Sequence, residues 1–265
     1  MSDDVWFSVT SLGDQMNCDF VDAAKRGAPS VVWRAGQDRR LQIMLSALSL
    51  NAGSRLLVNG CGLGLYMREI NKYCSSVHGL DIEVTRLLSA VVDDLLVAGQ
   101  CEHLPYSDNS FDGVISHEVL EHVVDDYKSV HEIVRVLRKP DNVNGIAGGR
   151  AIIFVPNKLY PFETHGLYWR NKYYFGNFPL VNYLPSKLRN FFVPHVRAYL
   201  SSDIIKLFDG LQIKIVSHTV IFGGYDKLVA RWPIVGNFIR TSLHALEHTV
   251  GRWVGLSHVV VIEKI

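Results

Sequence analysis

The sequence lacks a strong bias of charge, because its 27 Lys and Arg residues nearly balance its 26 Asp and Glu residues and the formal net charge is +1. No stretch of the chain is rich in Lys or Arg. A basic patch is the usual electrostatic footprint of a protein that binds nucleic acid. We therefore expect no nucleic acid as the main partner.

Long uncharged apolar runs are also missing, so no segment approaches the length of a transmembrane helix. The N-terminus, Met1 to Asp4, has neither the basic region nor the apolar run of a signal peptide. The few cysteines have no metal-type spacing and fit reduced thiols; they are Cys18, Cys61, Cys74 and Cys101. These features predict a cytoplasmic protein.

Internal repeats and low-complexity segments are absent, which argues against a solenoid or a largely disordered chain. With 265 residues, 48% of them hydrophobic, the chain is long enough to bury one substantial core. We expect a single domain over residues 1–265.

One short segment, Arg55 to Gly64, carries the strongest signal for a ligand and reads Arg-Leu-Leu-Val-Asn-Gly-Cys-Gly-Leu-Gly. Its apolar half predicts a buried parallel strand, and its glycines predict a tight turn that lets a ligand approach the backbone. A second apolar run ends at Asp81, 21 residues after Gly60. An acid at this place can accept hydrogen bonds from ribose hydroxyls. The pattern indicates a nucleotide-type cofactor.

Short apolar runs and helical patterns alternate through the first part of the chain. Such alternation predicts a parallel sheet with helices on both faces and ligands at the carboxyl ends of its strands. The expected elements are a helix over 39–50, a strand over 55–59, a helix over 65–74, a strand over 77–81, a helix over 84–96, a strand over 113–116, a helix over 125–138 and a strand over 150–155.

The composition changes after this alternating part. Residues 158–200 are rich in Tyr, Phe, Pro and Asn without a sustained period, which predicts a cap over the site. A capped helix is expected over 201–208, and strands over 211–217 and 258–263. Between these strands, apolar residues recur at helical spacing, so the insertion 219–257 is expected to form one long helix with a wide apolar face. That face packs on the core or on a second copy in a homo-oligomer, or it contacts lipid.

The glycine spacing Gly60-Cys61-Gly62-Leu63-Gly64 differs from the G-x-G-x-x-G of dinucleotide folds. It resembles the first motif of class I S-adenosylmethionine-dependent methyltransferases, in particular their small-molecule group. Asp81 stands at the position of that family's ribose-binding acid. Residues 99–112 are similar to its adenine-reading stretch, and residues 114–123 to the segment over the sulfonium. The resemblance covers roughly residues 34–157.

The resemblance implies a Rossmann-like, doubly wound α/β sheet, mostly parallel and closed by an antiparallel C-terminal hairpin. It divides the chain into N-terminal helices (1–50), a cofactor-binding core (51–157), the cap (158–200) and a C-terminal helix and hairpin with the helical insertion (201–265). The implied cofactor is S-adenosyl-L-methionine, with S-adenosyl-L-homocysteine as product. The implied cofactor-binding residues are Arg34, Asn59, Gly60, Cys61, Gly62, Gly64, Asp81, Ile82, Gln100, Cys101, Glu102 and His117.

Two positions depart from the family pattern. Val58 stands where an acid is common, so the amino group of the cofactor is held by main-chain carbonyls or by Arg34, Gln37 and their neighbours. Gln100 replaces an Asp at the adenine position, and its carbonyl can still accept from an amino group. Both departures leave open a non-catalytic subunit that keeps the cofactor fold.

Methyl transfer to a hydroxyl needs a group that removes the acceptor's proton. His165 follows the last strand of the core and is the first candidate for a catalytic base, because histidine titrates near neutral pH. A histidine bonded to main chain is the alternative at this position. His122 is the second candidate, with a structural role in its turn as the alternative.

Glu118, Glu121, His122 and His165 form a ligand set that is able to hold a divalent cation. The arrangement resembles that of metal-dependent 2′-O-methyltransferases of small RNA ends, and part of it occurs in ubiquinone-type O-methyltransferases. The Leu-Glu-His segment is also common in members of the wider family without a metal. A metal is therefore not the favoured interpretation.

The resulting hypothesis is methyl transfer to an oxygen of a small molecule, such as a saccharide, polyketide, quinone or lipid-linked intermediate. The aromatic cap and the apolar insertion favour a bulky or amphipathic acceptor, and lipid contact at the periphery is compatible with them. A carbon methyltransferase is the alternative on the same fold. A nicotinamide-dependent oxidoreductase would use the same strand and Asp81, but the sequence shows no Tyr-x-x-x-Lys pair.

Overall fold

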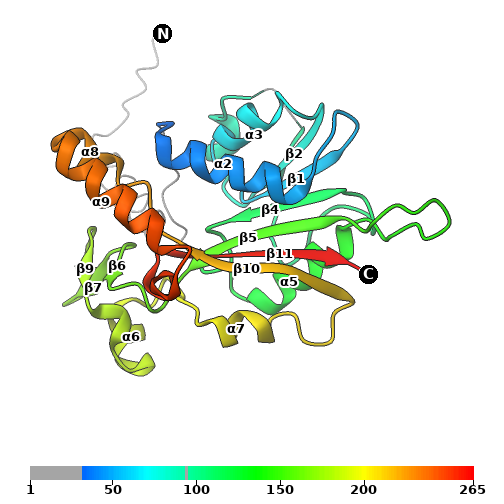
Figure 1. Cartoon of the computed structure of the whole chain (residues 1–265). Helices are drawn as coiled ribbons and strands as arrows, with labels where there is room; N and C mark the ends of the chain where they lie inside the picture. The colour runs from blue at the N-terminus through cyan, green and yellow to red at the C-terminus, as the bar shows by residue number, and fades with distance from the viewer. Residues whose placement is uncertain (1–31, 93–94) are drawn as a thin grey trace, which may run out of the picture.

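A seven-stranded sheet is the centre of the computed structural model, which describes residues 32–92 and 95–265. The strand order is β10-β11-β5-β4-β1-β2-β3 (Figure 1). β1 to β5 pair in parallel, and β11 runs antiparallel to both β5 and β10. The bounds are β1 Arg55–Asn59, β2 Ser76–Asp81, β3 Leu95–Ala98, β4 Gly113–His117, β5 Arg150–Pro156, β10 Ile213–Ile221 and β11 Ser257–Lys264. The predicted fold, with its antiparallel C-terminal hairpin, is confirmed.

Helices cover both faces of this sheet (Figure 1). Side chains alternate along a strand, so β1 places Leu57 in one apolar cluster and Leu56 and Val58 in the other. The cluster around Leu57 includes residues of α5 and α7, and the opposite cluster includes residues of α2 and α3. The bounds are α2 Ala35–Leu48, α3 Leu65–Ile70, α4 Val84–Leu88, α5 Asp126–Val136 and α7 Ser201–Lys206.

The helix predicted over 84–96 is wrong in its second half. The helix α4 ends at Leu88, and Leu95 begins β3, which pairs in parallel with β2. A short apolar run fits a helix or a strand equally well by periodicity, and here the free edge of β2 supplies the pairing partner. The helix predicted over 65–74 is also shorter, because α3 ends at Ile70.

The cap over residues 158–200 contains short elements instead of one regular layer. Two small antiparallel sheets pair β6 with β9 and β7 with β8. Figure 1 shows these elements and α6 together at one end of the main sheet. The bounds are β6 Phe162–Glu163, β7 Leu167–Trp169, β8 Lys172–Tyr174, β9 Phe178–Pro179, η1 Val181–Tyr183 and α6 Ser186–Phe192.

The apolar spacing predicts one long helix over the insertion 219–257, and this prediction is wrong. The insertion contains α8 (Asp226–Arg231), α9 (Pro233–Leu246) and the 3₁₀ helix η2 (Val250–Val254), after β10 has run on to Ile221. Pro233 explains the break, because proline has no backbone N–H and restricts the residue before it, so it starts a new helix.

The predicted wide apolar face of this insertion remains largely in solvent. Ile234 is 87% exposed and Phe238 is 73% exposed. Trp232 is also exposed, and the guanidinium of Arg231 lies 4.9 Å from the centre of its ring. Among the described helices, none combines the length and the apolar character that crossing a bilayer requires.

Lys264, near the end of β11, fastens the sheet to the end of α5. Its side chain is almost buried, and Nζ lies 2.6 to 3.1 Å from the carbonyl oxygens of Val134, Arg135 and Leu137 and from Oδ1 of Asn109. The last carbonyls of a helix have no partner within the helix and carry partial negative charge. The ammonium therefore satisfies these carbonyls in place of water.

We predict that Lys264→Met lowers the free energy of unfolding by about 2–3 kcal/mol, because the buried carbonyls lose their donor. Urea unfolding followed by circular dichroism measures the change. Lys139→Met, at an exposed neighbouring position, is the matched control and should change stability by less than about 0.5 kcal/mol. Equal effects of the two substitutions would contradict the role of Lys264.

Candidate active site

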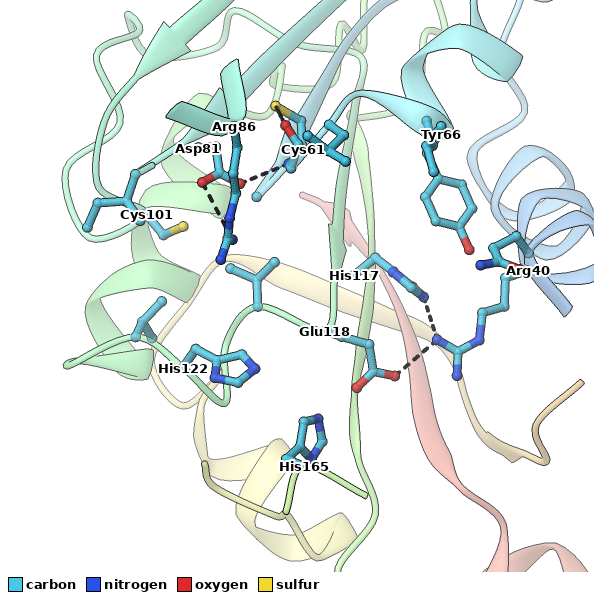
Figure 2. A pocket seen from close by; sticks show the side chains of 18 of the residues that line it. Arg40, Cys61, Tyr66, Asp81, Arg86, Cys101, His117, Glu118, His122 and His165 are labelled. Atoms are coloured by element: carbon cyan, nitrogen blue, oxygen red, sulfur yellow. Dashed lines mark hydrogen bonds and ion pairs between the residues drawn. The ribbon is translucent and has the colours of Figure 1, made fainter. Parts of the chain in front are cut away.

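A cavity of about 1220 Å³ lies at the carboxyl ends of the parallel strands. Residues after β1, β2 and β4 line it, together with the N-terminal part of α2, the segment before α8 and two loops of the cap (Figure 2). The structure brings these sequence candidates to its wall: Arg34, Gly60, Cys61, Gly62, Asp81, Ile82, Gln100, Cys101, Glu102, His117, His122 and His165. Asn59 and Gly64 do not line the cavity, and the side chain of Asn59 is fully buried.

The loop after β1 has a backbone that favours glycine. Gly60, Gly62 and Gly64 have φ angles of 75°, 55° and 75°. A β-carbon at Gly60 would also lie 2.3 Å from a methyl group of Val119. The amides of Gly60 and Cys61 both donate to the carbonyl of Leu80 in β2, so the loop folds back over the neighbouring strand.

Asp81, at the end of β2, is fixed by this loop. Its Oδ2 accepts a hydrogen bond from the amide of Gly62 at 2.8 Å, and its Oδ1 accepts one from the amide of Glu83 at 2.9 Å. Nη1 of Arg86 lies 3.9 Å from Oδ1 (Figure 2). The carboxylate is 4% exposed, so it is held in one orientation at the wall of the cavity.

The two cysteines at the wall are unsuited to thiolate chemistry. Burial, reinforced by the charge of Asp81, raises the pKa of Cys61 to about 12. Burial, reinforced by Glu102 and Asp81, raises the pKa of Cys101 to about 12. A thiol with such a pKa is almost fully protonated near neutral pH and is a poor nucleophile.

Arg40, on α2, is a wall residue that the sequence analysis missed. Figure 2 shows its guanidinium directed at His117 and Glu118. Nη1 bonds to Nε2 of His117 and lies 3.2 Å from Oε1 of Glu118, while Nη2 donates to Oγ of Ser257 at 3.2 Å. Its spacing of three residues from Gln37, which places both on one side of a helix, is the signal that would have found it.

These contacts set the charges at the end of β4. Burial, together with the positive charge of Arg40, lowers the pKa of His117 to about 3. Burial alone would raise the pKa of Glu118, but Arg40, His117 and the hydrogen bond from Ser257 lower it to about 2. The backbone of Glu118 has a φ of 55°, a conformation that is strained for a side chain of this size.

A second group of side chains lies at the cap side of the cavity. The rings of His122 and His165 are 5.6 Å apart, and Nδ1 of His165 lies 3.1 Å from Oε1 of Glu163 (Figure 2 shows the two histidines). One ligand atom each from Glu121, His122 and His165 lies within 4.8 Å of the others. Glu118, the fourth residue of the sequence-derived ligand set, is not part of this group, because Arg40 and Ser257 hold its carboxylate.

Comparison with known sequences gives partial matches. A family profile described as "Methyltransferase domain" matches residues 57–141. Sterol 24-C-methyltransferase erg6 of Schizosaccharomyces pombe is 33% identical over 109 residues, which cover 37% of this chain and 29% of that protein. A probable S-adenosylmethionine-dependent methyltransferase of Mycolicibacterium smegmatis is 32% identical over 136 residues, which cover 49% of this chain and 52% of that protein. The chain thus spans 29% and 52% of the length of these two relatives.

Comparison with solved structures supports the fold over a larger part of the chain. The crystal structure of an S-adenosylmethionine-dependent methyltransferase from Mesorhizobium loti superposes with a TM-score of 0.57 at 17% sequence identity. The superposition covers 87% of this chain and 98% of that structure.

The low pKa of His117 predicts a dependence of stability on pH. Its ordinary value of 6.5 applies to the unfolded chain, which therefore binds this proton below pH 6.5, whereas the folded protein does not until about pH 3. The free energy of unfolding must then fall as the pH drops through this window. This one group contributes at most about 1.4 kcal/mol per pH unit.

His117→Gln should reduce the slope of the free energy of unfolding against pH between pH 6 and pH 4. The reduction should correspond to at most one proton, and urea unfolding at a series of pH values measures it. His131→Asn, at an exposed position on α5, should leave the slope as in the wild type. An unchanged slope in His117→Gln would show that the imidazole is not held neutral.

Proposed function

Because the chain carries a class I S-adenosylmethionine-dependent methyltransferase domain, we propose that it methylates a small-molecule acceptor bound in this cavity and leaves S-adenosylhomocysteine as product. The observation that carries the proposal is the hydrogen bond between the glycine loop and the buried carboxylate of Asp81 at the cavity wall. The profile match over residues 57–141 includes both partners of this bond.

The residues present fit the cofactor. Asp81 is fixed by two amides and would accept hydrogen bonds from the ribose hydroxyls. The side chain of Gln100 would accept from the adenine amino group, and Arg34 and Gln37 would hold the polar end of the methionine. A cavity of about 1220 Å³ exceeds the roughly 300–1,000 Å³ of sites for one drug-sized ligand, so it leaves room for an acceptor. When bound, the cofactor supplies an electrophilic methyl group on sulfur.

The reactive oxygen of the acceptor would meet His122 and His165. Glu163 accepts from Nδ1 of His165, which fixes the imidazole in the tautomer whose Nε2 is an acceptor. Methyl transfer to a hydroxyl oxygen would release the proton of that hydroxyl. The hydroxyl proton leaves toward His165. We therefore assign His165 the removal of this proton and His122 a place beside it.

Carbon methylation is the second candidate, and the likeness to a sterol 24-C-methyltransferase favours it. An alkene carbon attacks without a hydroxyl proton to lose, so it depends less on a base at this position. The pair of cavity-facing histidines favours the oxygen acceptor. Turnover of either kind of acceptor would exclude a non-catalytic subunit, and methyl transfer would exclude the nicotinamide-dependent alternative.

For the acceptor class, we propose a bulky or amphipathic molecule. Asn177 of the cap and Tyr225 before α8 line the cavity, so the cap (158–200) and the insertion both border it. The exposed apolar side chains of α9 lie next in the chain and suit a lipid-linked or polyketide-like acceptor. Methylation of small, highly polar acceptors alone would contradict this part of the proposal.

Asp81→Asn should weaken binding of S-adenosylhomocysteine by about 10- to 100-fold, because the substitution removes a charged acceptor from the ribose site. Isothermal titration calorimetry measures the affinity. Asp108→Asn, at an exposed carboxylate paired with Arg135, is the matched control and should bind as the wild type does. No binding by the wild-type chain would refute the proposed function itself.

His165→Ala should lower kcat by about 100-fold or more for an oxygen acceptor, which is the usual contribution of a positioned base. The affinity for S-adenosylhomocysteine should stay unchanged, because His165 lies on the acceptor side. His131→Asn is the control. A loss of less than tenfold would favour the carbon acceptor.

A further inference from the structure

We propose that Glu121, His122 and His165 bind one divalent transition-metal ion of the Zn²⁺, Fe²⁺ or Mn²⁺ kind at the acceptor end of the cavity. This inference rests on the proposed function for its role in catalysis, but the site itself is argued from the side chains alone. It also changes the role of His165 from a direct base to a metal ligand.

The first argument is the state of Glu121. Glu121 is 1% exposed, and no cationic or hydroxyl side chain of the described residues donates a hydrogen bond to either carboxylate oxygen. Its polar neighbours include its own backbone and the carboxyl group of Glu118. An ionised carboxylate is very costly to bury without a partner. A cation is the partner that this buried carboxylate lacks among the described residues.

The second argument is how His165 is held. Glu163, which is 2% exposed, lies 3.1 Å from Nδ1 of His165 through one oxygen and 2.6 Å from Nη2 of Arg189 through the other. Arg189 is itself buried and is oriented by Asn182 and the carbonyl of Val196. A carboxylate that orients the far nitrogen of a histidine is the usual outer partner of a metal-binding imidazole.

The third argument is the distance between the donor atoms. Nε2 of His122 lies 4.0 Å from Oε1 of Glu121, and a donor atom of each of the three residues lies within 4.8 Å of the others. Adjacent ligands of one ion, each about 2.0–2.4 Å from it, are about 3–4 Å apart, so the three donor atoms are spaced slightly more widely than a bound set. Small side-chain rotations would bring all three into contact with one ion.

The donor types select the ion. Two imidazoles and one carboxylate suit Zn²⁺, Fe²⁺ or Mn²⁺, whereas Mg²⁺ and Ca²⁺ prefer oxygen ligands throughout. Three protein ligands also leave positions for other molecules. His122 and His165 line the cavity, so such a position would face the acceptor. The ion would there hold an acceptor hydroxyl and make it more acidic.

The competing arrangement is a protonated Glu121 beside the ionised Glu118. It also explains a buried carboxyl, but it predicts no affinity for metal. Arg40 and Ser257 bind the carboxylate of Glu118. In the competing arrangement, protonated Glu121 would donate a further hydrogen bond to that carboxylate. Metal binding distinguishes the two arrangements without reference to activity.

The test is titration of chelator-treated protein with Zn²⁺ and with Mn²⁺ by calorimetry, and elemental analysis of the protein as purified. We expect one ion per chain, bound at least tenfold more tightly than Mg²⁺. Glu121→Gln and His165→Asn should each weaken binding by at least 100-fold. Glu163→Gln should weaken it by about 10- to 100-fold, since it acts through His165. His131→Asn should bind as the wild type does.

Binding of S-adenosylhomocysteine is measured on the same samples. Normal binding of this product with no stoichiometric metal, or metal binding that survives Glu121→Gln and His165→Asn, would overturn the metal site and leave the proposed function standing. The glutamine resembles a protonated Glu121 in shape, and an unchanged melting temperature establishes that the variant is folded. Binding of Co²⁺, followed by its visible absorption, gives a second readout of the ligand set.

Discussion

The hydrogen bond from the amide of Gly62 to the carboxylate of Asp81 is the contact on which the site depends. It joins the loop after β1 to the end of β2, and the neighbouring amides of Gly60 and Cys61 bond to the carbonyl of Leu80 in the same strand. The loop can follow this path because its glycines adopt positive φ angles. Contacts between this loop and the sheet therefore build this part of the cavity wall.

Charge is distributed unevenly around this wall. Arg40 holds Glu118 ionised and His117 neutral at the end of β4. Glu121 lies close to this cluster but receives no hydrogen bond from a cationic or hydroxyl side chain of the described residues. Glu118 and Glu121 are three residues apart in the chain, but only Glu118 has a cationic partner among the described residues. Glu121, on the cap side of the cavity, still requires a cation or a proton.

The fold and the cofactor side of the site follow from local patterns in the sequence. The apolar run, the glycines and Asp81 are close in the chain, so their spacing predicts their arrangement, and Gly60, Gly62 and Asp81 line the cavity together. Long-range contacts leave no such pattern. Arg189 reaches Glu163 across 26 positions, and Arg40 reaches Ser257 across 217. Pro233 interrupts the insertion, but the apolar period continues on both sides of it and by itself predicts one helix.

The two ends of the cavity come from different parts of the chain. Asp81 and Gln100, which we propose hold the nucleoside, lie within residues 57–141, the segment that matches the family profile. His165, its partner Glu163 and the buried Arg189 all belong to the cap. Since Arg189 stabilises Glu163 from inside that same segment, the cap carries its own internal support. A change within the cap can therefore alter the His165 end of the cavity while the hydrogen bond between Gly62 and Asp81 stays in place.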